Sequence, residues 1–253
     1  MRYEEREPTE ALKPYVKCIW TLNRDYSGAE GGETLWPDGC QEMLFHYGSA
    51  YSADGASLPP AFFLGMLSRS FRLDAAGRIR LYGVRLLPWG LKAFSEAPLK
   101  SFNDRAVPLD RVLEAADVAK LQTALASADM DEAYSLLERY LLSIVAPDRI
   151  DPRLLQALSR LYREPMETDI APVVSESGYS SRQFERKCLE LVGMPAKRLQ
   201  KIARFNQARL RIFREPTIDL HQCMLEFGYY DYAHFSKDFK LCLGVTPRNT
   251  KAG

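Results

Sequence analysis

The segment GYYDYAHFSKDF, residues 228–239, decides how the last part of this chain folds. It lies within LEFGYYDYAHFSKDFKLCLGVTPRN (225–249), and an earlier segment, SESGYSSRQFERKCLELVGMPAKRL (175–199), follows the same pattern. Gly178 and Tyr179 match Gly228 and Tyr229, and further matches continue through aromatic, basic and glycine positions. The chain therefore contains an internal repeat with a period of about 50 residues.

Each copy of the repeat predicts two helices joined by a tight turn. A glycine after a short helix permits the left-handed backbone that ends it. Ser180 in the first copy and Asp231 in the second can cap the next helix. In that helix Phe184, Cys188 and Leu191 lie at i, i+4 and i+7 and so share one buried face. Two helices arranged in this way form a helix-turn-helix, whose second helix can enter the major groove of DNA.

The side chains left outside by this packing include groups that can contact base edges or phosphates. An alternative is a helical hairpin repeat used only for packing, and the polar outward faces weigh against it. The candidate DNA-binding residues are Ser181, Arg182, Gln183, Glu185, Arg186 and Lys187 in the first copy, and Tyr232, Ala233, His234 and Lys237 in the second.

Between the copies, AKRLQKIARFNQARLRIF (196–213) contains neither Gly nor Pro and predicts one long helix. A helix of this length spans about 27 Å. With its flanks it can hold two recognition helices about one turn of DNA, roughly 34 Å, apart. Its apolar residues occur on more than one side, as expected for a helix packed between two units.

Residues from about 151 to 250 resemble the DNA-binding domain of the AraC/XylS family of bacterial regulators. The resemblance rests on S-x-R-x-F-x-R at 180–186, G-Y-x-D-x-A-H-F-S-K-D-F at 228–239 and G-V-T-P at 244–247. It implies base or phosphate contacts for Arg182, Glu185 and Arg186 and for Tyr232, His234 and Lys237, and RNA polymerase as a partner. Cys188 departs from the family, which usually has Phe there, and so is expected to loosen the first unit. Pro172 is expected in the first turn of its helix, after Asp169, where no intrahelical bond is lost.

The N-terminal part is punctuated by Gly and Pro and rich in aromatic and β-branched residues from about 12 to 103, which predicts many short strands. L-K-P-Y-V-x-C-I-W, W-P-D-G-C-Q-E-M-L-F and YGVRLLPWG resemble a domain of unassigned function often found before this DNA-binding domain. The resemblance implies a cupin-like β-barrel that senses a small molecule or mediates dimerisation.

We therefore predict an α+β chain: a cupin-like sensor domain at 1–108, a helical linker or dimerisation segment at 109–150, and a double helix-turn-helix at 151–253. The last boundary is set by the two prolines of APDRIDP (146–152). Residues 151–253 carry 17 Lys and Arg against 12 Asp and Glu, whereas residues 1–150 carry 17 against 21. A basic half beside an acidic half suits a nucleic-acid module joined to one that does not touch phosphates.

An effector pocket in the barrel is a further hypothesis. Its candidate lining is Trp20, Trp36, Phe45, Arg85 and Trp89, with Arg85 able to hold an anion. The competing interpretation makes the aromatic residues barrel core and Arg85 a solvated strand charge. Asp38 and Glu42 superficially resemble a catalytic pair, but Asp38 fits a turn and Glu42 an outward strand position.

Other classes of function find little support in the sequence. The three histidines are isolated, with no H-x-H, so no metal site is expected. There is no G-x-S-x-G, P-loop or G-x-G-x-x-G, so neither an enzyme nor a cofactor is expected. The five cysteines are widely spaced, which favours reduced thiols in the cytoplasm. No apolar run is long enough to span a membrane, and the polar, acidic start is not a signal peptide.

The sequence thus predicts a cytoplasmic, sequence-specific transcription regulator that binds double-stranded DNA. An activating or repressing role, a homodimer and the identity of a small-molecule effector stay open. One rival is a ligand-binding or enzymatic barrel with a vestigial DNA-binding tail, and another is a regulator that binds a protein instead of DNA. We expect sequence choice to depend mainly on the first unit and anchoring on the second.

Overall fold

The computed structural model describes residues 1–26, 31–49 and 51–250. Contacts divide the chain into two compact units. The strand unit comprises residues 1–35, 40–66 and 71–150, and the helical unit comprises residues 36–39, 67–70 and 151–253. Each unit has its own hydrophobic core.

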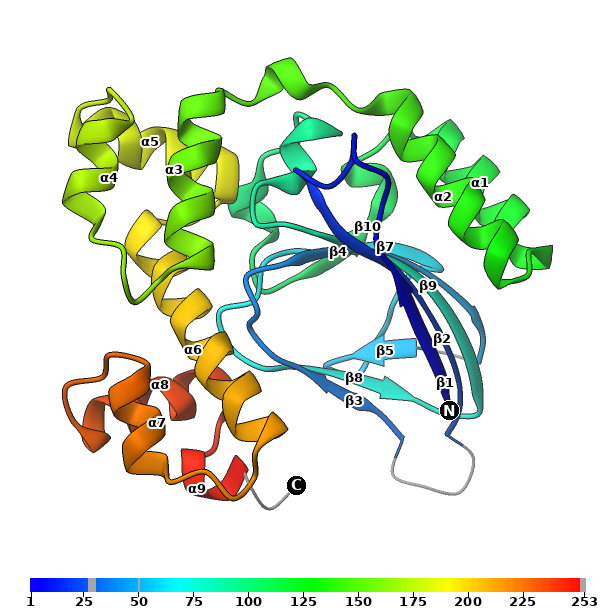
Figure 1. Ribbon diagram of the computed structural model, residues 1–253. Coiled ribbons are helices and arrows are strands. Elements are labelled where there is room, and N and C mark those ends of the chain that lie inside the picture. Colours follow the sequence, from blue (N-terminus) through cyan, green and yellow to red (C-terminus); the bar gives the residue numbers. More distant parts are fainter. Residues whose placement is uncertain (27–30, 50, 251–253) are drawn as a thin grey trace. The chain divides into compact units, whose positions relative to one another are not determined.

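The strand unit contains two antiparallel sheets (Figure 1). The first has the order β1-β2-β9-β4-β7-β10, formed by Arg2–Arg6, Val16–Asp25, Arg78–Leu86, Gln41–Gly48, Ala61–Leu64 and Ala106–Pro108. The second has the order β3-β8-β5-β6, formed by Glu33–Leu35, Phe71–Ala75, Tyr51–Ala53 and Ala56–Ser57. The α+β fold is as predicted, and the described strands pair into two sheets in which no closed barrel is detected; the cupin-like assignment stays a prediction.

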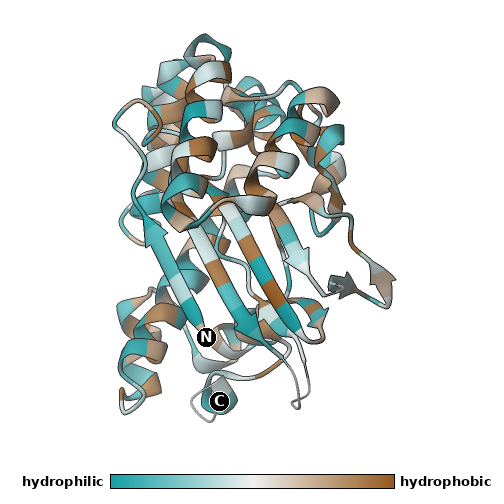
Figure 2. Ribbon diagram, turned by 90° about the vertical axis from the view of Figure 1, so that its right-hand side faces the viewer, coloured by the Kyte–Doolittle hydropathy of each residue, from teal (hydrophilic) through white to brown (hydrophobic). Residues whose placement is uncertain are grey.

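The central strands are buried on both faces, although their hydropathy alternates in places (Figure 2). On β2, Trp20 and Leu22 point to the side that holds a cavity, while Ile19 and Thr21 point to the opposite side. The Thr21 hydroxyl lies 3.5 Å from the Met130 sulfur, at the start of a helix on that opposite side. Because both faces are covered, these strands are rich in large apolar residues.

Two helices complete the strand unit, α1 (Ala115–Ser127) and α2 (Met130–Ile144). A capping box starts α2, because Asp129 accepts from the Glu132 backbone N–H and Glu132 accepts from the Asp129 backbone N–H. Short 3₁₀ turns lie at Gly90–Ala93, Leu99–Phe102, Leu109–Arg111 and Pro147–Arg149.

The helical unit is built around α6 (Ala196–Arg214), against which α3 (Pro152–Arg163), α5 (Ser181–Val192) and α7 (Leu220–Glu226) pack. The remaining helices are α4 (Ile170–Glu176), α8 (Tyr232–Leu243) and α9 (Pro247–Thr250). Buried residues occur on several sides of α6, which confirms that this helix packs between the two helix-turn-helix units. Pro172 is the third residue of α4, in the first turn, as predicted.

Candidate nucleic-acid interface

The two repeats fold as α4–turn–α5 and α7–turn–α8. Gly178 and Gly228, in the two turns, have φ angles of +74° and +63°. A residue with a Cβ adopts this left-handed conformation only with strain, which explains why both copies use glycine. The structure confirms the helix-turn-helix pattern expected of each copy.

Both recognition helices begin at a side-chain cap. The Ser180 hydroxyl accepts the Gln183 backbone N–H at 3.3 Å, and the Gln183 side-chain oxygen accepts the Ser180 backbone N–H at 3.0 Å. In the second copy the Asp231 carboxylate accepts the His234 backbone N–H at 2.7 Å. Gln183 thus holds the start of α5 in the free protein, a role that the sequence reading did not give it.

The buried faces of α5 and α8 follow the predicted spacing. Phe184, Cys188 and Leu191 are buried on α5, and Phe235, Phe239 and Cys242 on α8. Cys188 is wholly buried and its thiol donates to the Met194 carbonyl oxygen at 3.2 Å. Burial raises the pKa of the Cys188 thiol to about 12.

The sequence-predicted DNA-binding residues lie on the opposite sides of these two helices. In α5, Glu185 and Lys187 are half-buried, and in α8 His234 is half-buried. The others are exposed: Ser181, Arg182, Gln183, Arg186, Tyr232, Ala233 and Lys237. The structure thus gathers each set on one helix face, while base and phosphate contacts by these residues stay predictions.

The first recognition helix is positioned by a cluster around Tyr179. The Tyr179 hydroxyl donates to the Asp151 carboxylate, which also accepts the backbone N–H and guanidinium of Arg153. These hydrogen bonds hold the pKa of Asp151 below its usual range, and the bond from the Arg153 side chain has the largest effect. The Lys187 ammonium lies 5.1 Å from the centre of the Tyr179 ring. The cluster therefore ties α5 to the start of α3.

The second recognition helix is tied to α6 by residues that the sequence reading missed. The Arg204 guanidinium lies over the buried Tyr229 ring, 4.5 Å from its centre, and 3.9 Å from the Asp238 carboxylate. The same carboxylate oxygen lies 4.0 Å from His234 Nε2, whose ring packs edge-on against Tyr229. Asp238 is only 7% exposed, three residues after Phe235 on the buried face. In the sequence, an acidic residue within an otherwise apolar helix face is the signal that could have indicated this buried ion pair.

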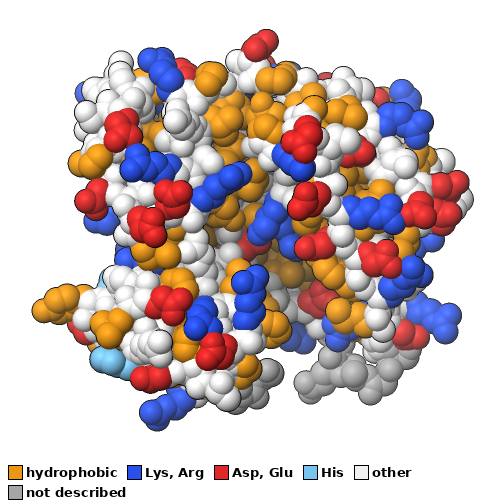
Figure 3. Space-filling view, in the orientation of Figure 1, with side chains coloured by type: hydrophobic (Ala, Val, Ile, Leu, Met, Phe, Trp, Pro, Cys, Tyr) orange, Lys and Arg blue, Asp and Glu red, His pale blue; other side chains and the backbone are white. Residues whose placement is uncertain are grey.

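Hydrophobic side chains project over the α7–α8 region (Figure 3). Tyr230, in the turn, is 93% exposed, and Leu225 and Tyr232 on either side are also exposed. A turn that presents aromatic surface next to the exposed face of α8 can contact a sugar-phosphate backbone as well as bases.

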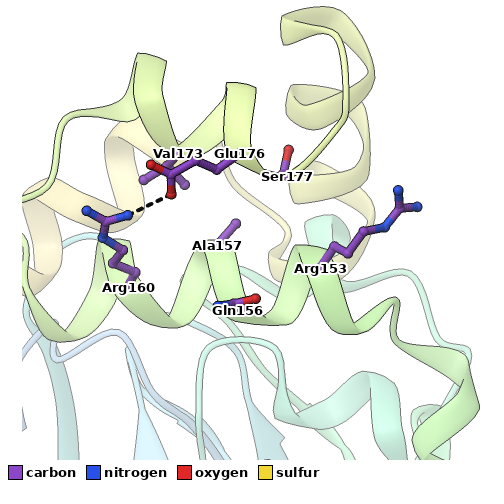
Figure 4. A pocket seen from close by; sticks show the side chains of 7 residues that line it. All are labelled: Arg153, Gln156, Ala157, Arg160, Val173, Glu176 and Ser177. Carbon is purple, nitrogen blue, oxygen red and sulfur yellow. Dashed lines mark hydrogen bonds and ion pairs between the residues drawn. The ribbon is translucent and has the colours of Figure 1, made fainter.

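A pocket of about 160 Å³ separates α3 from α4 (Figure 4). Arg160 of α3 donates to Glu176 of α4 at 2.8 Å across one end, and Arg153 points away from that pair at the other. Both paired side chains are about half exposed, so the pair contributes only about 0–1 kcal/mol. The pocket is thus a small gap between two packed helices, and a surface ion pair spans it.

A second cavity, of about 290 Å³, lies in the strand unit, and Trp20 and Arg85 both line it. Arg85 Nε donates to Glu42 Oε1 at 2.8 Å and Trp20 Nε1 to Glu42 Oε2 at 2.9 Å. Glu42, expected to point outward, instead faces this cavity with its side chain 14% exposed.

The other three residues predicted for an effector pocket lie elsewhere. Phe45 is buried on the opposite face of β4, because it is an odd number of positions from Glu42. Trp89 is buried after β9 and donates to the Pro14 carbonyl oxygen at 2.8 Å. Trp36 is 41% exposed and belongs to residues 36–39, which group with the helical unit.

In the part of the chain that the structure describes, neither unit has a ready site for a metal. Within residues 1–26, 31–49 and 51–250, no group of three or more His, Cys, Asp and Glu side chains could hold an ion. None of the helices in the described part of the chain is long and apolar enough to cross a membrane.

Comparisons with known proteins agree with this architecture. Residues 173–253 match a family described as a helix-turn-helix domain, and residues 4–108 match a domain of unknown function (DUF6597). No curated protein sequence matches the chain.

Among solved structures the chain is similar to ToxT from Vibrio cholerae. The similarity covers 92% of this chain and 98% of that one, at 14% identity and a TM-score of 0.51. A structure of unsaturated fatty acid bound ToxT from the same organism matches 97% of this chain and 96% of its own, at 12% identity and a TM-score of 0.48. At such identities the similarity concerns the fold. The helix-turn-helix match and this shared fold agree with the resemblance of residues 151–250 to the AraC/XylS family, and residues 4–108 match a domain of unknown function.

Proposed function

We propose that this chain regulates transcription by inserting α5 and α8 into two successive major grooves on one face of a specific DNA site. The observation that carries the proposal is the duplicated helix-turn-helix, with the polar faces of both recognition helices exposed. The 19 residues of α6 give a helix of about 28 Å, comparable to the roughly 34 Å of one DNA turn.

Within this arrangement the two recognition helices have different tasks. Arg182 and Arg186 are exposed on α5, and a guanidinium can bond in bidentate fashion to guanine. On α8 the exposed Lys237 suits a phosphate contact, while His234 is partly occupied with Asp238 and Tyr229. We therefore assign sequence choice mainly to α5 and anchoring mainly to α8.

The strand unit supplies regulation in this proposal, by binding a small-molecule effector. Its cavity between the two sheets, with charged and aromatic side chains in its lining, supports ligand binding over a purely structural role. The rival, a ligand-binding or enzymatic unit with a vestigial tail, predicts no sequence preference for DNA.

Selection of DNA sequences with the purified full chain tests the proposal. We expect one enriched site with two half-sites about one helical turn apart. Arg186→Ala should then weaken binding by about 1–3 kcal/mol and relax the preference at one position of the first half-site. Arg139→Ala is the matched control, because Arg139 is an exposed arginine of α2. No enriched sequence, or equal effects of the two substitutions, would refute DNA reading by α5.

A further inference from the structure

The cavity of the strand unit lies between its two sheets. Its lining comes from β1, β2, β4 and β9 of one sheet and from β3, β5 and β8 of the other. Its volume of about 290 Å³ is near the lower end of small-molecule sites, which run from about 300 to 1,000 Å³. The cavity therefore suits a compact ligand.

Most of the cavity wall is apolar or aromatic. Trp20 crosses β9 at Gly83, where an added Cβ would lie 2.2 Å from the indole ring. The absence of a side chain at Gly83 lets the indole reach Glu42, two strands away in the sheet. Tyr3 packs 5.9 Å from Trp20, ring centre to ring centre. The remaining lining includes Tyr51 and the leucines Leu22, Leu35, Leu44, Leu73 and Leu81.

Two carboxylates from opposite sheets also line the cavity. Glu42 on β4 is held by Arg85 and by the Trp20 indole, one donor to each oxygen. Glu33 on β3 has its side chain 22% exposed and accepts from Arg24 at 3.2 Å and from the Tyr26 hydroxyl. Each carboxylate therefore accepts from two donors, one of which is a guanidinium.

Among the ionisable side chains that line the cavity in the described residues, two are the carboxylates of Glu33 and Glu42 and one is the Arg85 guanidinium, which is bonded to Glu42. Arg24, outside the lining, pairs with Glu33. An anionic ligand would compete with Glu42 for Arg85, and it would also face Glu33. A cationic ligand meets two carboxylates and the electron-rich faces of aromatic rings, which attract cations. The pKa of the Tyr51 phenol is raised first by burial and then by Glu33, with Glu42 acting in the same direction. The two carboxylates thus act on the same region of the cavity.

We propose that this cavity binds a small hydrophobic cation, an ammonium group on a compact apolar body. The ammonium is directed to the carboxylates of Glu33 and Glu42, and the apolar body packs against Trp20, Tyr3 and the leucines. Arg85 keeps Glu42 in place instead of binding the ligand. This assignment rests on the proposed role of the strand unit as an effector sensor and names the class of effector.

Calorimetric titration of the full chain with three probes of similar size tests the assignment. The probes are phenethylammonium, phenethyl alcohol and hydrocinnamate, which are cationic, neutral and anionic. We expect phenethylammonium to bind at least tenfold more tightly than either of the others. Tighter binding of hydrocinnamate, or no saturable binding of phenethylammonium, would overturn the proposal.

Substitutions at Glu33 locate the binding. Glu33→Gln should weaken phenethylammonium binding at least tenfold and leave phenethyl alcohol unchanged, whereas Glu33→Asp should keep the preference for the cation. Glu7→Gln is the matched control, because Glu7 is 83% exposed and outside the lining. Equal affinities of the cation for wild type and a folded Glu33→Gln variant would place the cation elsewhere and overturn the assignment.

A DNA titration without any probe separates this inference from the proposed function. Cation binding by a chain that selects no DNA site refutes the regulator and leaves the cavity assignment standing. Selective DNA binding by a chain that ignores phenethylammonium refutes the cavity assignment alone.

Discussion

Truncation of Phe239 to alanine tests how the second helix-turn-helix is held together. Phe239 is wholly buried, and its ring centre lies 4.7 Å from that of Phe235 and 5.1 Å from that of Phe205, both at steep angles. Phe→Ala in a core costs about 3–5 kcal/mol. Each edge-to-face pair adds about 0.5–1.5 kcal/mol beyond area burial, so we expect the upper part of that range.

The corresponding residue of the first unit provides a matched comparison. Cys188 is equally buried but small, with one sulfur hydrogen bond to Met194. Cys188→Ala removes few contacts, and we expect a loss of about 1 kcal/mol, typical of a single substitution. The two variants together show whether the repeat is stabilised asymmetrically.

Hydrogen exchange of the full chain, followed segment by segment, is the appropriate assay because it reports local opening free energies. Phe239→Ala should reduce protection of α7 and α8 strongly while leaving β2 and β9 unchanged. Whole domains are stable by only about 5–15 kcal/mol, so this loss is a large share of the stability, and binding to the second half-site should also weaken. A loss below about 1 kcal/mol in α8, or an equal loss in β2, would refute this account of the core.

Three further predictions concern the first recognition helix and the buried thiols. Glu190→Ala frees Arg186 from an exposed ion pair of 3.2 Å, worth about 0.3–0.5 kcal/mol, and removes a negative charge near the DNA. DNA affinity in a titration should rise about twofold, and weaker binding would contradict a DNA contact by Arg186. Ser180→Ala removes the cap of α5 and should cost about 1 kcal/mol in urea unfolding; an unchanged midpoint would count against the cap. Burial raises the pKa values of Cys188 and Cys242 to about 12, so both thiols stay protonated at pH 8. A disulfide reagent should therefore label these two thiols only after the chain unfolds. Rapid labelling of either thiol in the native chain would contradict this prediction.

Features set by neighbouring residues were predictable from the sequence. The turns after α4 and α7, the caps Ser180 and Asp231 and the buried stripes of α5 and α8 depend on residues within one or two helical turns. Local geometry fixes these features wherever the segment is placed, so the pattern was sufficient.

Features that depend on distant partners were missed or misplaced. β1 (Arg2–Arg6) is a polar edge strand, and its short polar sequence carries no hydrophobic alternation that marks a strand. Strand alternation predicted that Glu42 and Phe45 lie on opposite faces but not which face meets solvent, because this sheet is covered on both sides. Closure of the sheets into a barrel also depends on the pairing of strands distant in sequence, which local patterns do not determine, and the described strands form two sheets.

The two helix-turn-helix units have the same kind of turn but hold their recognition helices in different ways. This difference bears on which recognition helix reads the DNA sequence. Tyr229 is 2% exposed and is held by Arg204 from the central helix, which gives α8 a rigid mount on α6. Tyr179 is only half-buried, and its hydroxyl reaches Asp151, the residue that also caps α3. A rigid mount with few free base-reading groups suits anchoring, because phosphate contacts fix register without reading bases. The more exposed α5, with two exposed arginines that can reach bases, suits sequence choice, so the difference in mounting and the difference in exposed side chains point the same way.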